Sequence, residues 1–244
     1  MGRFFILFYY HIKNINGLFK LKVHIPFFLA LFEEFEKKNV NLKLLNKTLL
    51  LLEKFHFIFT HIASLRASGL DNKYSKFAIR IRNEKDKNKV IEDLKTELSS
   101  KIPKKDEYVQ KFKELNFNKN KDTIKFILLR LEKEVDSSLA LDFELHSLEH
   151  LKPKSIKSQD VNNIGNLFLL EEEYNNQDKG AKKPFDIDKK SKKSIIELLK
   201  NKTKYKTTKD EFTDIINSKV WTKNEIEKRA DKLAIKTYNI FSKL

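Results

Sequence analysis

The stretch DSSLALDFELHSLEHLKP, residues 136–153, alternates apolar and polar side chains, whereas most of the chain repeats its apolar residues at helical spacing. Alternation with a period of two is typical of a half-buried strand. Pro153 disfavours helix at Lys152 and cannot donate a hydrogen bond to a strand ladder. We therefore expect a short strand that ends near His150.

A second strand and a short helix are predicted directly afterwards. NNIGNLFLL, residues 162–170, supplies a Gly-Asn turn followed by an apolar run, and EEEYNNQDKGAKK, residues 171–183, suits the start of a short helix. Strand, turn, strand and helix make a compact ββα unit. The sequence thus predicts a mainly α protein with a small ββα unit inserted among helices.

Helical periodicity surrounds this unit on both sides. Residues 25–135 read as helix after helix, with Pro26 in the first turn of one of them. Near the C-terminus, Thr222 and Glu225 match a capping box at the start of the last helix, and Trp221 is placed to pack against that helix as a staple. We assign residues 1–137 to a helical region and residues 138–244 to a domain that holds the ββα unit and the C-terminal helices.

Several apolar residues share one predicted helical face and are expected in the core. One stripe comprises Ile124, Ile127, Leu128, Leu131 and Val135. A second stripe, on the last helix, comprises Ile226, Ala230, Leu233, Ala234 and Phe241. His56 and His61 lie inside a segment that is apolar nearly all round, so we interpret them as packing histidines.

The composition favours a polyanionic partner. The 244 residues include 50 Lys and Arg against 34 Asp and Glu, which gives a formal net charge of +16 at pH 7. Such a balance is typical of proteins that bind nucleic acid, although a Lys-rich proteome encoded by an AT-rich genome produces the same excess. The chain has no Cys, which excludes disulfides and thiolate metal sites and fits the reducing cytoplasm, where we expect the protein.

The apolar N-terminal segment is not expected to enter a membrane. Its first run, residues 4–12, is too short to span a bilayer and is followed directly by Lys13. Its second run, residues 25–32, passes into Glu33 and Glu34, as in an amphipathic helix. We therefore expect a soluble protein without a membrane partner.

An acid–histidine pair at the end of the predicted strand is a candidate for phosphodiester hydrolysis. That reaction needs an activated water and a cation on the scissile phosphate. His150 suits the first task because the pKa of histidine lies near neutrality. Glu149 and Asn175 each offer an oxygen to a hard cation such as Mg²⁺. The alternative is a solvated strand end, because acid–histidine pairs are common.

Three segments resemble the C-terminal domain of the GmrSD group of modification-dependent (type IV) restriction endonucleases. They are SLEHLKP at 147–153, IGNLFLLEEEYNNQDKGAKKPF at 164–185 and WTKNEIEKRADKLAIKTYNIF at 221–241. They carry a His-x-x-Pro motif, a Gly-Asn-Leu-x-Leu-Leu run followed by an Asn, and a Trp-x-x-x-x-Ile-x-x-Arg helix. The first two also resemble the core of HNH, or ββα-metal, nucleases. The resemblance covers roughly residues 120 to 244.

The resemblance implies a metal-dependent DNA endonuclease that restricts foreign or modified DNA. His150 would be the general base, and Asn166 would hold the loop that orients it. Glu149 and Asn175 would bind Mg²⁺ or Mn²⁺. This chain carries extra residues, NQDKGA, after Asn175, so either Asn175 or Asn176 would face the metal.

One feature of the family is missing from this sequence. Members usually begin with a nucleotide-dependent domain marked by an Asp-Gly-Gln-Gln-Arg motif, which does not occur here. We therefore expect this chain to lack that domain, either as a split subunit that works with a separate nucleotide-dependent subunit, or as the product of a broken reading frame or a fragment. The alternative is a non-catalytic helical remnant that binds nucleic acid or a partner.

A lysine-rich stretch follows the candidate site. Residues 179–209 contain 12 Lys against three acidic residues. Within it, Lys182, Lys183 and Lys189 lie closest to the motif, and we expect them to contact DNA phosphates, although a solvated surface would have the same composition.

Overall fold

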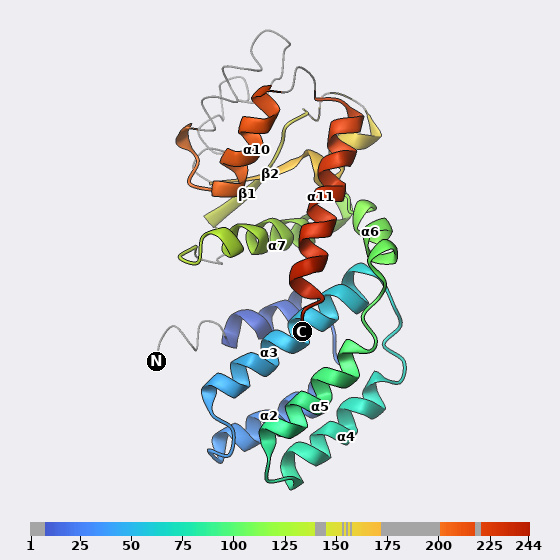
Figure 1. Cartoon of the computed structure of the whole chain (residues 1–244), viewed down its shortest axis with the longest axis vertical. Coiled ribbons are helices and arrows are strands. Elements are labelled where there is room, and N and C mark those ends of the chain that lie inside the picture. Colours follow the sequence, from blue (N-terminus) through green and yellow to red (C-terminus); the bar gives the residue numbers. More distant parts are fainter. Residues whose placement is uncertain are drawn as a thin grey trace. The chain divides into compact units, whose positions relative to one another are not determined.

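The structure, a computed structural model, describes residues 8–139, 145–152, 154, 156, 158–171, 201–217 and 221–244. These residues are mainly helical and include a two-stranded sheet, as the sequence predicted (Figure 1). The chain divides into two compact units, Met1–Lys111 with Tyr238–Leu244, and Phe112–Thr237. The helix expected around Asn175 lies outside the described residues.

The first unit consists of helices around a core of Phe, Leu and Ile side chains. Its elements are the π-helical η1 (Lys13–Leu18) and η2 (Phe57–Ile62), with α2 (Ile25–Glu36), α3 (Leu42–His56), α4 (Leu70–Asn83), α5 (Lys87–Ser99) and most of α6 (Lys105–Lys113). Pro26 lies in the first turn of α2, as predicted. The side chain of Asn41 caps α3 by accepting a hydrogen bond from the backbone of Leu44 at 2.9 Å.

Two buried histidines, His24 and His56, lie in this core. Their ring centroids are 5.9 Å apart, and His56 Nε2 is 2.8 Å from the hydroxyl of Tyr74. Burial lowers the pKa of His24 to about 4 and that of His56 to about 3, and His24 contributes to the second shift. His61 packs on Phe19 with ring centroids 4.8 Å apart. His56 and His61 are therefore packing histidines, as predicted.

We expect the first unit to lose stability as the pH falls from 7 to 5. The folded-state pKa values of His24 and His56 are lowered, so this stability is fully present above the unfolded value of about 6.5 and is lost as the pH falls toward the folded values. Each histidine accounts for about 2 kcal/mol at pH 5. Urea unfolding at the two pH values measures the loss. Burial also lowers the pKa of His61 to about 4, so three histidines share the loss. His24→Leu should therefore remove about a third of it, and an unchanged loss would contradict this explanation.

The second unit contains the sheet, which lies between α7 (Phe117–Val135) and α10 (Lys206–Asn217) (Figure 1). Strands β1 (His146–His150) and β2 (Leu167–Glu171) are antiparallel, with His150 opposite Leu167. The first strand ends at His150, as predicted. Residues 151–166 connect the strands through two short 3₁₀ turns, η4 (Gln159–Asn162) and η5 (Ile164–Asn166).

The last helix, α11 (Lys223–Phe241), begins with the predicted capping box. The backbone N–H of Thr222 donates to Glu225 Oε2 at 2.9 Å. The five apolar residues predicted for its inner face are all buried. On α7, four of the five predicted core residues are buried, but Val135 is 51% exposed, because it is the last residue of the helix.

A buried carboxylate fixes the start of α10. Glu132 of α7 accepts hydrogen bonds from the backbone N–H groups of Lys206 at 2.6 Å and Thr207 at 2.9 Å. These N–H groups have no partner within their own helix, and the positive end of the helix dipole favours a negative charge there. Glu132 therefore anchors α10 to α7.

Among the described residues, none of the helices has the length and apolar character needed to cross a bilayer.

Candidate active site

His150 is the last residue of β1 and is 6% exposed. Its Nε2 is 3.3 Å from Oδ1 of Asn162, and its ring meets that of Phe117 edge-on at 4.7 Å between centroids. A carboxamide oxygen only accepts hydrogen bonds, so the contact suits the tautomer of His150 that carries its proton on Nε2. The lone pair then lies on Nδ1, and neutral imidazole in this form can accept a proton from water.

Basic side chains surround the aromatic neighbour of His150. Phe117 is half-buried at the start of α7, and Nζ of Lys154 lies 4.2 Å from its ring centroid. Nζ of Lys121, one turn along α7, lies 5.9 Å from the same centroid. Cations over an aromatic face are attracted to it, so Phe117 holds two positive charges beside His150.

Asn166 is fully buried and ties together both ends of the loop that follows His150. Its Nδ2 donates to the carbonyls of Lys152 at 2.9 Å and Val161 at 2.8 Å. Its Oδ1 accepts from the N–H of Lys152 at 2.7 Å and from Nε1 of Trp221 at 3.0 Å. The carboxamide thus has four partners, the number it can satisfy.

A salt bridge closes the same loop. Nζ of Lys152 lies 2.8 Å from Oδ2 of Asp160, and both side chains are largely buried. Burial alone would raise the pKa of Asp160, but hydrogen bonding, chiefly from Lys152, lowers it below its usual value. Asp160 therefore keeps its charge, and the ion pair stabilises the loop beside His150.

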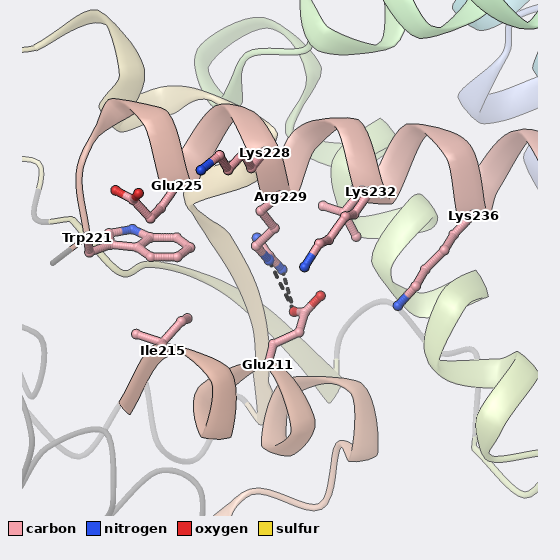
Figure 2. Close-up of a pocket in the computed structure, with 9 residues that line it drawn as sticks. Glu211, Ile215, Trp221, Glu225, Lys228, Arg229, Lys232 and Lys236 are labelled. Atoms are coloured by element: carbon pink, nitrogen blue, oxygen red, sulfur yellow. Dashed lines mark hydrogen bonds and ion pairs between the residues drawn. The ribbon is translucent and has the colours of Figure 1, made fainter. Parts of the chain in front are cut away.

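Arg229 of α11 clamps the start of β2. Its Nη1 donates to the carbonyls of Gly165 at 2.9 Å and Leu167 at 2.7 Å. Its Nη2 forms an ion pair with Glu211 at 2.7 Å (Figure 2). Its guanidinium lies 3.7 Å from the ring centroid of Phe168. A buried guanidinium needs such partners, and here they join α10, α11 and the start of β2.

Gly165 is required by the close approach of α11. A Cβ at this position would lie 2.0 Å from the carbonyl oxygen of Ile226 and 3.1 Å from the backbone nitrogen of Ala230. All three named positions of the Trp-x-x-x-x-Ile-x-x-Arg motif therefore touch the Gly-Asn-Leu run: Trp221 through Asn166, Ile226 through Gly165, and Arg229 through the carbonyls. This contact explains why the two motifs occur together in one chain.

Glu149 precedes His150 within the strand, where it pairs with Phe168. Successive side chains of a strand point to opposite faces. Glu149 therefore leaves the sheet on the face of Phe168, and His150 leaves it on the face of Leu167.

The other predicted site residues lie outside the described part of the chain: Asn175, Asn176, Lys182, Lys183 and Lys189. Across the described ranges, no group of three or more His, Asp or Glu side chains is arranged to hold a metal ion. His146, at the other end of β1, is buried and hydrogen-bonded to the hydroxyl of Tyr205, so it is a packing residue.

Sequence reasoning missed two neighbours of His150. Asn162 lies in the run NNIGN, where three Asn share similar local surroundings, and nothing in their spacing indicates which one contacts His150. Phe117 lies more than thirty residues before His150 and reads as an ordinary helical aromatic. The place of Arg229 in the Trp-x-x-x-x-Ile-x-x-Arg motif indicates that this residue has a role. The motif alone does not specify which atoms Arg229 contacts.

Comparison with known proteins identifies the family. A family model described as GmrSD restriction endonucleases, C-terminal domain, matches residues 102–236. Searches of curated proteins and of solved structures found no match. The matched residues cover more than half of the chain and contain His150, its loop and the motif of α11. The chain therefore belongs to the GmrSD restriction endonuclease family and carries its C-terminal, nuclease-type domain.

Proposed function

We propose that this chain is an HNH-type endonuclease that hydrolyses DNA phosphodiester bonds with His150 as the general base, in the restriction of foreign or modified DNA. A restriction endonuclease domain implies DNA as its substrate. The observation that carries the proposal is the setting of His150. It ends a strand, its Nε2 meets Asn162, and its loop is held by Asn166.

In this mechanism, Nδ1 of His150 takes a proton from a water beside the scissile phosphate. The water oxygen forms a bond to phosphorus, and the bond from phosphorus to the leaving oxygen breaks. The leaving oxygen then takes a proton from solvent. Asn162 fixes the tautomer, and Asn166 keeps the loop in place. Lys121 and Lys154 bring positive charge next to His150, which favours a bound phosphate.

The donor chemistry of the proposed metal ligands fits Mg²⁺ or Mn²⁺. Glu149 and Asn175 offer oxygen atoms, which such hard cations prefer. A bound cation would neutralise charge that builds up on the phosphate. Glu149 leaves the strand on the face opposite His150, so a cation on Glu149 would have to reach the phosphate beside His150 around the end of the strand. Lys182, Lys183 and Lys189 remain predicted contacts to the DNA backbone.

Cleavage of supercoiled plasmid by the purified chain tests this proposal. We expect nicking that requires Mg²⁺ or Mn²⁺ and stops when EDTA is added. Asn175→Ala should cut poorly at low Mn²⁺ and recover as Mn²⁺ is raised, because it weakens metal binding. Asn176→Ala is the matched control and should behave like the parent chain.

The outcome also decides between a metal-dependent nuclease and a non-catalytic binding module. Equal cleavage in EDTA would rule out the metal-dependent mechanism. A reversed response of the two Asn variants would make Asn176 the ligand. Should the chain bind DNA but cut under no metal or nucleotide condition, the non-catalytic binding module replaces the nuclease.

A further inference from the structure

A groove between α10 and α11, away from His150, has the chemistry of a nucleotide-binding site. Its volume is about 270 Å³. Glu211 and Ile215 of α10 line one side, and Trp221 precedes the helix that lines the other (Figure 2). The remaining lining residues belong to α11: Glu225, Lys228, Arg229, Lys232, Leu233 and Lys236.

Three exposed lysines run along the α11 side of the groove. Lys228, Lys232 and Lys236 are four residues apart, so successive positions rise by about 6 Å along one face of the helix. Figure 2 shows them in a row on α11. Evenly spaced positive charges on one face match the successive phosphates of an extended strand, because such binding is dominated by charge.

Each of the two acidic residues in the lining is hydrogen-bonded to a group other than the three lysines. Glu211 is paired with Arg229 at 2.7 Å, and Glu225 accepts the hydrogen bond of the capping box. By contrast, no carboxylate among the described residues forms a salt bridge with any of the three lysines. The groove therefore presents net positive charge to a ligand.

Trp221 provides a fixed aromatic surface at the end of the groove. Its side chain is half-buried, its Nε1 donates to Asn166, and its ring centroid is 6.1 Å from that of Phe168. Two contacts thus fix the orientation of the indole before any ligand arrives. A preorganised aromatic ring binds a base without the entropic cost of ordering a side chain.

We propose that this groove binds unpaired nucleotides of a DNA strand, with phosphates on Lys228, Lys232 and Lys236 and a base stacked on Trp221. Stacking requires an unpaired base, so the occupant is single-stranded rather than duplex DNA. The groove is a second DNA contact of the proposed nuclease, so the ligand class rests on that function. Occupancy of the groove does not require that His150 be catalytic.

The single Trp of the chain makes the proposal directly measurable. We expect the fluorescence of Trp221 to be quenched when a short oligo-dT binds to the full chain in EDTA. An oligonucleotide of equal length with abasic sites should bind about 5- to 150-fold more weakly and leave the fluorescence almost unchanged, because it cannot stack. A duplex of the same length should quench far less.

A charge-matched pair of variants tests the lysines. Changing Lys228, Lys232 and Lys236 to Gln should make the slope of log K for DNA binding against log salt less negative by about 2. Each phosphate contact on a single strand contributes about 0.7 to the size of that slope. The control changes Lys76, Lys85 and Lys104, exposed residues of the first unit, to Gln and removes the same charge. It should retain most of the parental slope and all of the quenching. Thermal unfolding checks that both variants are folded.

Three results would overturn the proposal. They are equal slopes for the two variants, equal quenching by the abasic strand, and equal quenching by the duplex at equal affinity. Binding is measured in EDTA and cleavage is measured separately on plasmid, so the two proposals fail independently. Quenching without cleavage would support the proposal that the groove binds nucleotides and would contradict the proposal that the chain is a nuclease.

Discussion

Replacing His150 by alanine is expected to slow metal-dependent plasmid cleavage by about 10²–10⁴-fold, the usual loss when a general base is removed. His150 ends β1 with its Nε2 directed to Asn162, and Ala at this position leaves no group to take the proton from water. The effect should fall on the rate of cutting. The affinity for DNA should change little, because the charges on Lys121 and Lys154 remain.

The matched control is His61→Ala. This residue packs on Phe19 in the first unit, and its replacement should leave the cleavage rate at the parental value. Thermal unfolding and oligonucleotide binding are measured for both variants, so that a folding defect is not mistaken for lost chemistry. If His150→Ala cuts as fast as the parent, His150 is not the general base and the HNH-type assignment is wrong.

The second large effect is expected from Gly165→Ala. The added Cβ would lie 2.0 Å from the carbonyl oxygen and 2.9 Å from the carbonyl carbon of Ile226. Both are backbone atoms, so no side-chain rotation relieves the clash, and α11 must move away. That movement breaks the hydrogen bonds of Arg229 to the start of β2. We expect a loss of about 3 kcal/mol or more in the free energy of unfolding, together with loss of cleavage.

Gly17→Ala is the matched control, because a Cβ at Gly17 meets nothing within 4 Å. It should change the free energy of unfolding by no more than about 1 kcal/mol. Urea unfolding followed by circular dichroism compares the two variants. Equal midpoints would mean that α11 does not approach the loop as closely as the structure indicates.

Much of the second unit could be predicted because its signals are local. The alternation of residues 141–145 and the restriction imposed by Pro153 predict a strand that ends near His150. The start of α11 follows from Thr222 and Glu225, which are three residues apart. The buried face of α11 follows from the 3.6-residue period, because one side of the helix repeats apolar residues.

The remaining features depend on contacts between distant residues, which periodicity does not encode. Glu132 caps a helix that begins 74 residues later. Arg229 contacts carbonyls 62 to 65 residues before it. The face to which Glu149 points depends on strand pairing, since an acid–histidine pair suits either a strand or its end. The motifs of the family indicate which residues belong to the candidate site, and the structure shows which atoms those residues contact.

The contact between α11 and the loop also sets the order in which the site forms during synthesis. Arg229 is added 64 residues after Gly165, which takes about 3 to 13 s at ordinary rates of translation. Until then, the loop after His150 lacks Trp221 and Arg229, and the carbonyls held by Arg229 are without that partner. A ribosome that stalls before residue 221 therefore displays an unfinished nuclease domain. Competence to cut would arise only in chains translated far enough to contain the clamping helix.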